Sequence, residues 1–274
     1  MTSIAAEEGT LVRVIDPDDG QPTWAHRRDD GLVEVPGTIE RLHRRHRAGE
    51  QLATGRRLES DTDLAFLPAV SPTKIVCVGL NYRQHADEMG RSLPEVPLLF
   101  MKPPSALVGP GDAIELPPQS DEVHHEGELA VVIGRRLRRA DRTEAADAIF
   151  GYSCACDVTA RDIQRREDRY TRSKGFDTFA PIGPSVALAP EFVPADHRLT
   201  CRVDGEIRQT TVLDDFIFPV DEVLSFISGV MTLEPGDVVL TGTPSGVGPI
   251  DDGQVVTVEI DGIGILKNPV IHRD

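Results

Sequence analysis

The sequence predicts an α+β protein in which strands dominate. Short apolar runs separated by Pro and Gly turns are typical of strands, and they occur at residues 75–78, 129–133, 186–188, 238–240 and 255–260. Helical patterns are few, chiefly residues 143–150, 160–169 and 220–231. Because strands and helices do not alternate regularly, this distribution favours a mostly-β core with peripheral helices over a doubly wound βαβ sheet.

The first 70 residues are rich in Arg, Asp and Gly, unlike the strand-rich sequence that follows. This difference predicts a small N-terminal domain, with residues 71–274 forming the larger one. The boundary is placed at residues 68–72, which have Pro at both ends. Within the small domain we expect a strand at residues 11–15 and an amphipathic basic helix at 37–49. The basic run 43–47 could suggest RNA binding, but no aromatic residues interleave it, so a solvent-exposed helix face is expected.

Composition excludes several classes of function. The 274 residues include 45 acidic and 29 basic side chains, a net charge of -16, which argues against nucleic-acid binding. A small anionic substrate fits only if a local cation holds it. The longest apolar runs fall well short of the ~20 residues of a membrane span, and no secretory signal is recognised, so a cytoplasmic protein is expected.

Two further site types are disfavoured by spacing. The four cysteines (Cys77, Cys154, Cys156 and Cys201) are expected to be reduced thiols, and the C-x-C pair with no second pair does not suit zinc. The glycine-rich residues 242–248 lack the Lys and Ser or Thr of a phosphate-binding loop, since Pro249 and Ile250 follow. The G-x-G-x-x-G spacing also fails, so nucleotide cofactors are disfavoured.

Glu126 and Glu128 form the strongest candidate site. They lead directly into the apolar run 129–133, and residues i and i+2 of a strand point to the same face. Two carboxylates that converge at the edge of a sheet need a counterion, and a hard divalent cation takes oxygen ligands. The alternative is a solvent-exposed strand end with alternating Glu.

Asp157 lies between a predicted strand at residues 150–156 and a helix expected from about residue 159. A carboxylate at this junction could be a third metal ligand. Asp is also a favoured helix N-cap, and the local pattern leaves both roles open.

His85, Glu88 and Lys174 are candidate catalytic residues. His85 and Glu88 are neighbours at i and i+3 of a helical turn, where the carboxylate can raise the basicity of the imidazole for activating water; an ordinary surface pair is the alternative. Lys174 is one of only four lysines and lies near Phe176. Its ammonium would suit an enolate or a carboxylate, or a structural pair with Asp177.

Taken in order, these motifs resemble the fumarylacetoacetate hydrolase superfamily over roughly residues 74–270. The matching stretches are GLNY at 79–82 with His85 and Glu88, FMKP at 100–103, E-x-E-L at 126–129, DVTARD at 157–162, KGFD at 174–177, GE-x-RQ at 205–209 and TGTP-x-GVG at 241–248. The resemblance implies a mixed β-roll around a metal, a smaller N-terminal domain and a homodimer.

The resemblance also implies roles for individual residues. Glu126, Glu128 and Asp157 fall where the family has its carboxylate ligands for Mg²⁺ or Mn²⁺, with Ca²⁺ possible in crystals. Lys174 matches the active-site lysine, and His85 with Glu88 matches the His-Glu pair. The positions implied to bind substrate are Tyr82, Lys102, Gln164 and Thr243. One departure is Cys156, where members often carry Asn before the ligand Asp.

The implied function is metal-dependent cleavage of a carbon-carbon bond in a 2-oxo acid. If His85 and Glu88 deliver water to a second carbonyl, the reaction is hydrolysis of an acylpyruvate or fumarylpyruvate. An enolate stabilised by the metal and Lys174 would equally serve an oxaloacetate-like decarboxylase or an isomerase of aromatic catabolism. A non-catalytic dimer that binds a metabolite is a further alternative.

Overall fold

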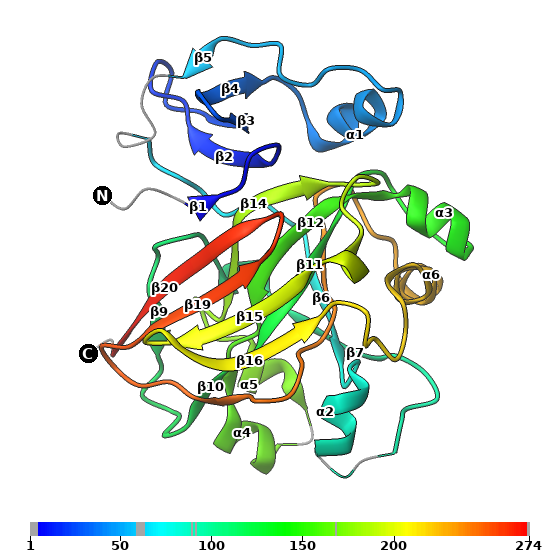
Figure 1. The fold of residues 1–274 in the computed structure, drawn as a ribbon. Helices are drawn as coiled ribbons and strands as arrows, with labels where there is room; N and C mark the ends of the chain where they lie inside the picture. Colours follow the sequence, from blue (N-terminus) through cyan, green and yellow to red (C-terminus); the bar gives the residue numbers. More distant parts are fainter. Residues whose placement is uncertain (1–4, 59–63, 89, 91, 168, 273–274) are drawn as a thin grey trace.

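The computed structural model describes residues 5–58, 64–88, 90, 92–167 and 169–272, and only the backbone of residues 85–87. Strands dominate, which confirms the predicted fold class, and they form a large sheet, a smaller sheet packed against it and a short three-stranded sheet (Figure 1). Within the described part of the chain, no helix has the length and apolarity that crossing a bilayer would require.

The large sheet runs through the whole molecule. Its strands, in spatial order, are β5 (Arg57–Leu58), β4 (Gly31–Val35), β3 (Pro22–Arg28), β2 (Leu11–Ile15), β14 (Ala180–Leu188), β12 (Ile149–Cys156), β11 (Gly127–Ile133), β17 (Val238–Leu240), β6 (Ile75–Gly79) and β7 (Leu98–Lys102), with β8 (Leu107–Val108) also paired to β14. Most neighbours are antiparallel, but β17 and β6 are parallel.

The other two sheets complete the β structure. The smaller sheet contains β1 (Ala5–Ala6), β20 (Gly264–His272), β19 (Val255–Ile260), β15 (Arg198–Val203) and β16 (Glu206–Val212), with β9 (Ile114–Leu116) paired to β20. The three-stranded sheet consists of β13 (Thr159–Ala160), β10 (Val123–His125) and β18 (Gly248–Pro249). Glu126 is the single residue between β10 and β11, so it lies where the chain passes from the three-stranded sheet into the large one.

The unbroken apolar run 129–133 lies in β11 and contacts a core on each face of the sheet. Leu129, Val131 and Ile133 face the main core, which includes residues of the smaller sheet. Ala130 and Val132 face a second core that includes residues of the first 58. Because both faces of the strand are covered, every residue of β11 is buried.

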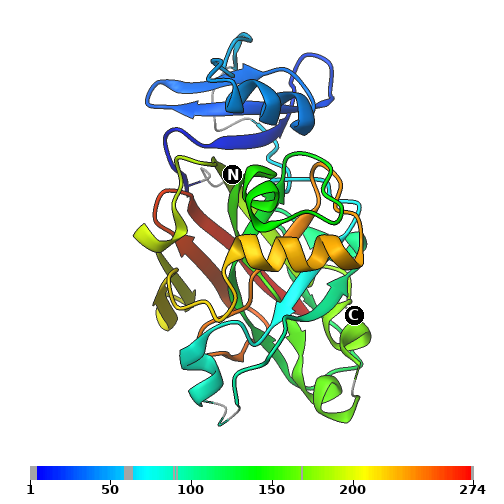
Figure 2. The ribbon, with the colours of Figure 1, turned by 90° about the vertical axis from the view of Figure 1, so that its right-hand side faces the viewer.

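The helices lie at the periphery, as the sequence predicts. They are α1 (Ile39–Arg47), α2 (Arg83–Glu88), α3 (Arg142–Asp147), α4 (Arg161–Arg166), α5 (Tyr170–Lys174) and α6 (Val220–Val230), with 3₁₀ turns η1 (Pro104–Ala106) and η2 (Pro194–Asp196). α3 and α6 lie side by side on one side of the large sheet (Figure 2).

Two helix predictions need correction. The helix predicted at residues 143–150 ends at Asp147, because Ile149 already pairs with β11 as the start of β12. The helix predicted at 160–169 ends at Arg166, since the backbone is extended at Glu167 and Arg169, and a separate helix, α5, follows at Tyr170–Lys174. This break lets α5 place Lys174 at its C-terminal end.

Residues 11–58, from β2 to β5, form a lobe at one end of the molecule (Figure 1). The predicted basic helix is α1, with Arg44 and Arg47 exposed but His43 buried against Phe150. β14 joins the lobe to the large sheet by pairing Val186 with Leu11. The predicted division at residue 70 stays a prediction. All four cysteines are buried free thiols, as expected.

The buried carboxylate of Asp237 ties the start of β6 to the start of β17. It accepts hydrogen bonds from the backbone N–H groups of Thr73 (2.9 Å), Lys74 (3.1 Å) and Glu234 (2.8 Å), and from the Lys74 ammonium. These contacts hold the starts of the two strands together, where Ile75 and Val238 form the first pair of the parallel ladder.

Asp237→Ala should lower the free energy of unfolding by about 3–5 kcal/mol, because it leaves several partly buried donors, the Lys74 ammonium among them, without their carboxylate partner. Arg142→Ala is the control, since it removes an exposed ion pair with Asp221 and should cost about 0–1 kcal/mol. Urea unfolding of both variants measures the difference. An equal decrease in the free energy of unfolding for both variants would show that the Asp237 contacts stabilise the fold no more than an exposed ion pair does.

Candidate active site

A cavity of about 680 Å³ opens where the large and three-stranded sheets meet α4 and α5. Its lining includes most of the residues that the sequence singles out: Glu126, Glu128, Asp157, Gln164, Lys174 and Thr243. These side chains come from points far apart in the chain. The fold therefore assembles one site from several of the quoted motifs.

The three carboxylates form one buried cluster. Ligand oxygens of Glu126, Glu128 and Asp157 all lie within 4.8 Å of one another. The backbone N–H of Asp157 donates to the Glu126 carbonyl at 2.8 Å, which holds the end of β12 beside the start of β11. Glu128 accepts a hydrogen bond from the backbone N–H of Gly242 at 2.8 Å. The cluster is thus fixed by backbone contacts on two sides.

Asp157 does not cap a helix. The residue that precedes α4 is Ala160, which makes no side-chain cap hydrogen bond. The Asp157 carboxylate instead accepts from the ammonium groups of Lys174, at 2.6 Å, and Lys102. Of the two roles left open by the sequence, the helix cap is wrong.

Lys174 lies at the centre of this charge network. Its Nζ donates to Glu126 Oε2 (2.9 Å), Asp157 Oδ2 (2.6 Å) and Thr159 Oγ1 (2.8 Å). The same atom lies 4.9 Å from the centre of the Phe100 ring, a cation–π contact. Its carboxylate partners are therefore the cluster residues and not the exposed Asp177.

The charges set the protonation of the cluster. Burial alone would lower the pKa of Lys174, but Asp157 and Glu126 outweigh the burial and raise it, so Lys174 is an ammonium at neutral pH. Burial would raise the pKa of Glu126, but Lys174 and Arg161 lower it to about 2. For Glu128, burial raises the pKa well above its usual range, and the negative charges of Asp157 and Glu126 add to this.

The donor set suits a hard divalent cation. Carboxylate oxygens are the ligands that Mg²⁺ and Mn²⁺ prefer, and three of them converge from a rigid part of the fold. A cation there would relieve the repulsion that raises the pKa of Glu128. Glu126, Glu128 and Asp157 are thus the residues that could hold a metal.

The other predicted residues fall in different places. Gln164 and Thr243 line the cavity, whereas Lys102 is fully buried and contacts Asp157. Tyr82 is buried in the main core with its ring 4.9 Å from that of Phe216, and it does not line the cavity. Its role in substrate binding stays a prediction.

His85 and Glu88 belong to α2. The side chain of His85 lies outside the described residues, and Glu88 is exposed at the end of the helix. Whether the two act as a pair on water therefore stays a prediction.

Arg161 was given no role in the sequence analysis although it lies in the DVTARD motif. It begins α4, lines the cavity and donates hydrogen bonds to Glu126 and to Gln164. Its position three residues before Gln164 on one helix was the available signal. Phe100 was missed in the same way, as part of FMKP.

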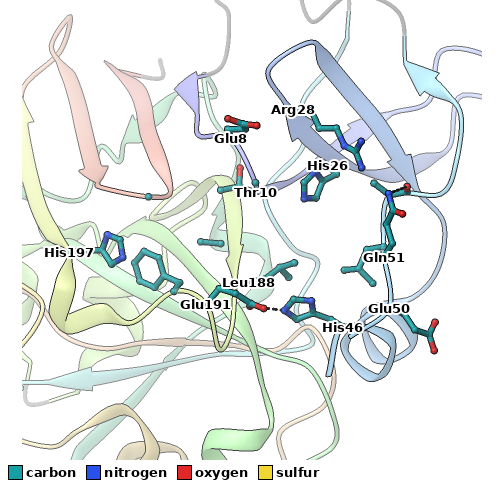
Figure 3. A pocket seen from close by; sticks show the side chains of 16 residues that line it. Glu8, Thr10, His26, Arg28, His46, Glu50, Gln51, Leu188, Glu191 and His197 are labelled. Atoms are coloured by element: carbon teal, nitrogen blue, oxygen red, sulfur yellow. Dashed lines mark hydrogen bonds and ion pairs between the residues drawn. The ribbon is translucent and has the colours of Figure 1, made fainter. Parts of the chain in front are cut away.

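A second cavity, of about 490 Å³, lies between the N-terminal lobe and the end of β14 (Figure 3). Histidines from both sides line it, and His46 Nε2 lies 2.8 Å from Glu191 Oε2 across the gap. None of the predicted catalytic or metal-binding residues lines this cavity.

The comparisons with known proteins establish the family. The family model for the fumarylacetoacetate (FAA) hydrolase C-terminal domain matches residues 74–271. The chain belongs to the fumarylacetoacetate hydrolase family. A mitochondrial oxaloacetate tautomerase of Bos taurus is 36% identical over 279 residues, covering 98% of this chain and 87% of that protein. The mitochondrial oxaloacetate tautomerase of Arabidopsis thaliana is 44% identical over 205 residues, covering 73% and 92%.

Two solved structures of named enzymes have a fold similar to that of this chain. The 5-carboxymethyl-2-hydroxymuconate delta-isomerase from Mycobacterium smegmatis matches with a TM-score of 0.85 and 38% identity, covering 96% of this chain and 100% of that one. A maleylpyruvate hydrolase from Sphingobium sp. SYK-6 matches with a TM-score of 0.78 and 30% identity, covering 96% and 100%. The named relatives are thus enzymes of more than one reaction type.

Asp157→Asn should weaken Mg²⁺ binding by more than about 100-fold, because it removes a charged ligand from the centre of the cluster. Isothermal titration calorimetry measures the affinity directly. Glu122→Gln is the matched control: its carboxylate pairs with Arg165 outside the cluster, so its Mg²⁺ affinity should stay within about threefold of wild type. Unchanged affinity in the Asp157 variant would reject the metal site.

Proposed function

We propose that the protein is a divalent-metal-dependent enzyme that interconverts the keto and enol forms of a 2-oxo dicarboxylic acid of the oxaloacetate class. The observation that carries this proposal is the charged ammonium of Lys174, which lies in the same cavity as three clustered carboxylates. An enolate develops negative charge on one oxygen, and a fixed cation beside that oxygen lowers its energy.

Charge balance supports a dianionic substrate. Glu126, Glu128 and Asp157 carry three negative charges when ionised. They are offset by the two lysines that contact Asp157 and by Arg161, which contacts Glu126. A divalent cation added to this neutral group leaves two positive charges, which an acid with two carboxylates would balance.

Different residues of the cavity would stabilise the charge that forms during enolisation and orient the substrate. A base takes a proton from C3 of the substrate, the electron pair of that C–H bond becomes the C2–C3 π bond, and the π pair of the C2 carbonyl moves onto its oxygen. The oxygen then takes up one proton and the base loses one, so the net change is the transfer of a proton from C3 to the C2 oxygen. Lys174 would stabilise that oxygen, and Arg161 and Gln164 would orient the carboxylate end from one face of α4. A bound divalent cation supplies Lewis-acid stabilisation of the same charge.

The relatives favour this reaction over hydrolysis. Two of them, from Bos taurus and Arabidopsis thaliana, are named as oxaloacetate tautomerases, and the Mycobacterium smegmatis structure is named as an isomerase. Both named reactions, the tautomerisation and the isomerisation, proceed without adding water. This supports the isomerase alternative of the sequence analysis more than its main interpretation.

Hydrolysis of an acylpyruvate is the second candidate. It is supported by the likeness to the maleylpyruvate hydrolase and by the predicted pair of His85 and Glu88, which would activate water. The homodimer, the cytoplasmic location, Mg²⁺ or Mn²⁺ as the metal, and the domain boundary at residue 70 are further parts of our proposal that the family resemblance or the sequence supports.

The purified protein should speed the loss of the oxaloacetate enol, followed by its ultraviolet absorbance, and chelation of Mg²⁺ should abolish the effect. Lys174→Arg should lower kcat by about 10²-fold, because the larger planar head keeps the charge but cannot reproduce the three contacts of the ammonium. Lys74→Arg is the control for the same change outside the cavity, and its kcat should be unchanged.

Wild-type kcat in Lys174→Arg would remove the lysine from the mechanism. No acceleration by the wild-type protein, together with Mg²⁺-dependent hydrolysis of an acylpyruvate, would favour the second candidate.

A further inference from the structure

Gln209 joins the smaller sheet to the candidate active site, although it does not line the cavity. It lies on β16 and is 1% exposed. Its Oε1 accepts a hydrogen bond from the backbone N–H of Gly127 at 2.9 Å, and its Nε2 donates to the Pro244 carbonyl at 2.8 Å and to Thr243 Oγ1 at 2.7 Å. The carboxamide thus bridges β11 and the glycine-rich loop.

The orientation of this amide is fixed by its neighbours. A backbone N–H can only donate and a backbone carbonyl can only accept, so Oε1 must face Gly127 and Nε2 must face Pro244. A flipped amide would lose both bonds in a buried place. His125 Nδ1 lies 3.2 Å from Oε1, so it carries the proton in that contact.

This orientation in turn fixes the hydroxyl of Thr243. Because the amide nitrogen Nε2 can only donate hydrogen bonds, Thr243 Oγ1 is the acceptor in that contact. The hydroxyl proton is then donated to the Gly127 carbonyl at 2.9 Å. One lone pair of the oxygen is left, and Thr243 lines the cavity that holds the carboxylate cluster. A ligand that reaches this oxygen from the cavity therefore meets an acceptor and not a donor.

We propose that Gln209 is a positioning residue that makes Thr243 a hydrogen-bond acceptor for the substrate, so that the site prefers a ligand with a hydroxyl donor over one with acceptors only. This proposal rests on the proposed function. The keto form of a 2-oxo acid has only acceptor oxygens at C2, whereas the enol form carries an O–H. A site that pairs with a hydroxyl rejects an analogue that lacks it, because its buried acceptor is then left without a partner.

The test compares two small dianions by calorimetry in the presence of Mg²⁺. Hydroxymalonate is achiral and carries a hydroxyl beside its carboxylates, whereas oxalate has acceptors only. Thr243→Val and Gln209→Met should each weaken hydroxymalonate binding by about 10-fold and oxalate binding by less than about threefold. The double variant should lose no more than either single variant, because the two residues act as one unit.

Conservative variants separate positioning from folding. Thr243→Ser keeps the hydroxyl and should restore the preference for hydroxymalonate. Gln209→Glu keeps an oxygen for Gly127 but loses the donor to Thr243, so it should behave as Gln209→Met. Asn268→Leu is the matched control, because it removes another buried amide, whose Nδ2 bonds to the carbonyls of Gly109 (2.8 Å) and Asp112 (2.9 Å). It should lower the melting temperature without changing the ratio of the two affinities.

The outcomes are distinct. Equal losses for both ligands, or additive losses in the double variant, would overturn the proposal while leaving the proposed function in place. If the Gln209 variants do not fold, the ligand preference of Thr243→Val still decides the acceptor role. A wild-type protein that binds neither ligand in Mg²⁺ would overturn both proposals.

Discussion

Three carboxylates buried within one small volume must be neutralised, and the active site is arranged around this requirement. An uncompensated charge in a protein interior costs several kcal/mol, so each carboxylate needs a partner that the fold brings to it. Lys102 comes from the edge strand β7, Arg161 from α4 and Lys174 from α5. The positions of these three elements are therefore linked to the charge of the site.

This link explains features that local propensity does not. The chain leaves the helical conformation between α4 and α5, so that Arg161 and Lys174 lie on separate helices and contact different oxygens of Glu126. The glycine-rich loop after β17 is held by its backbone: Gly242 donates to Glu128, and the amide of Asn81 donates to the carbonyl of Thr241 at 2.9 Å. A loop that resembles a phosphate cradle in its sequence thus supports a carboxylate.

The sequence predicted the parts of the site that depend on local pattern. The i, i+2 spacing of a strand was enough to predict that Glu126 and Glu128 lie together, although Glu126 itself precedes β11, and the apolar run after them predicted a buried strand. The choice between ligand and cap at Asp157 needed the tertiary contacts with lysines. Arg161 and Gln209 were quoted within motifs but given no role, because the contacts with Glu126 and Thr243 that define their roles are distant in the chain. Boundaries such as the end of α3 were missed because pairing with β11 overrides helix propensity.

The most direct test of this account is a crystal structure of the protein grown with Mn²⁺, with the anomalous signal of the metal measured. The account predicts a peak bound by Glu126, Glu128 and Asp157, with the Lys174 ammonium still beside the Asp157 carboxylate. A peak elsewhere in the molecule, or a cluster closed by the three cations with no metal at saturating Mn²⁺, would contradict it.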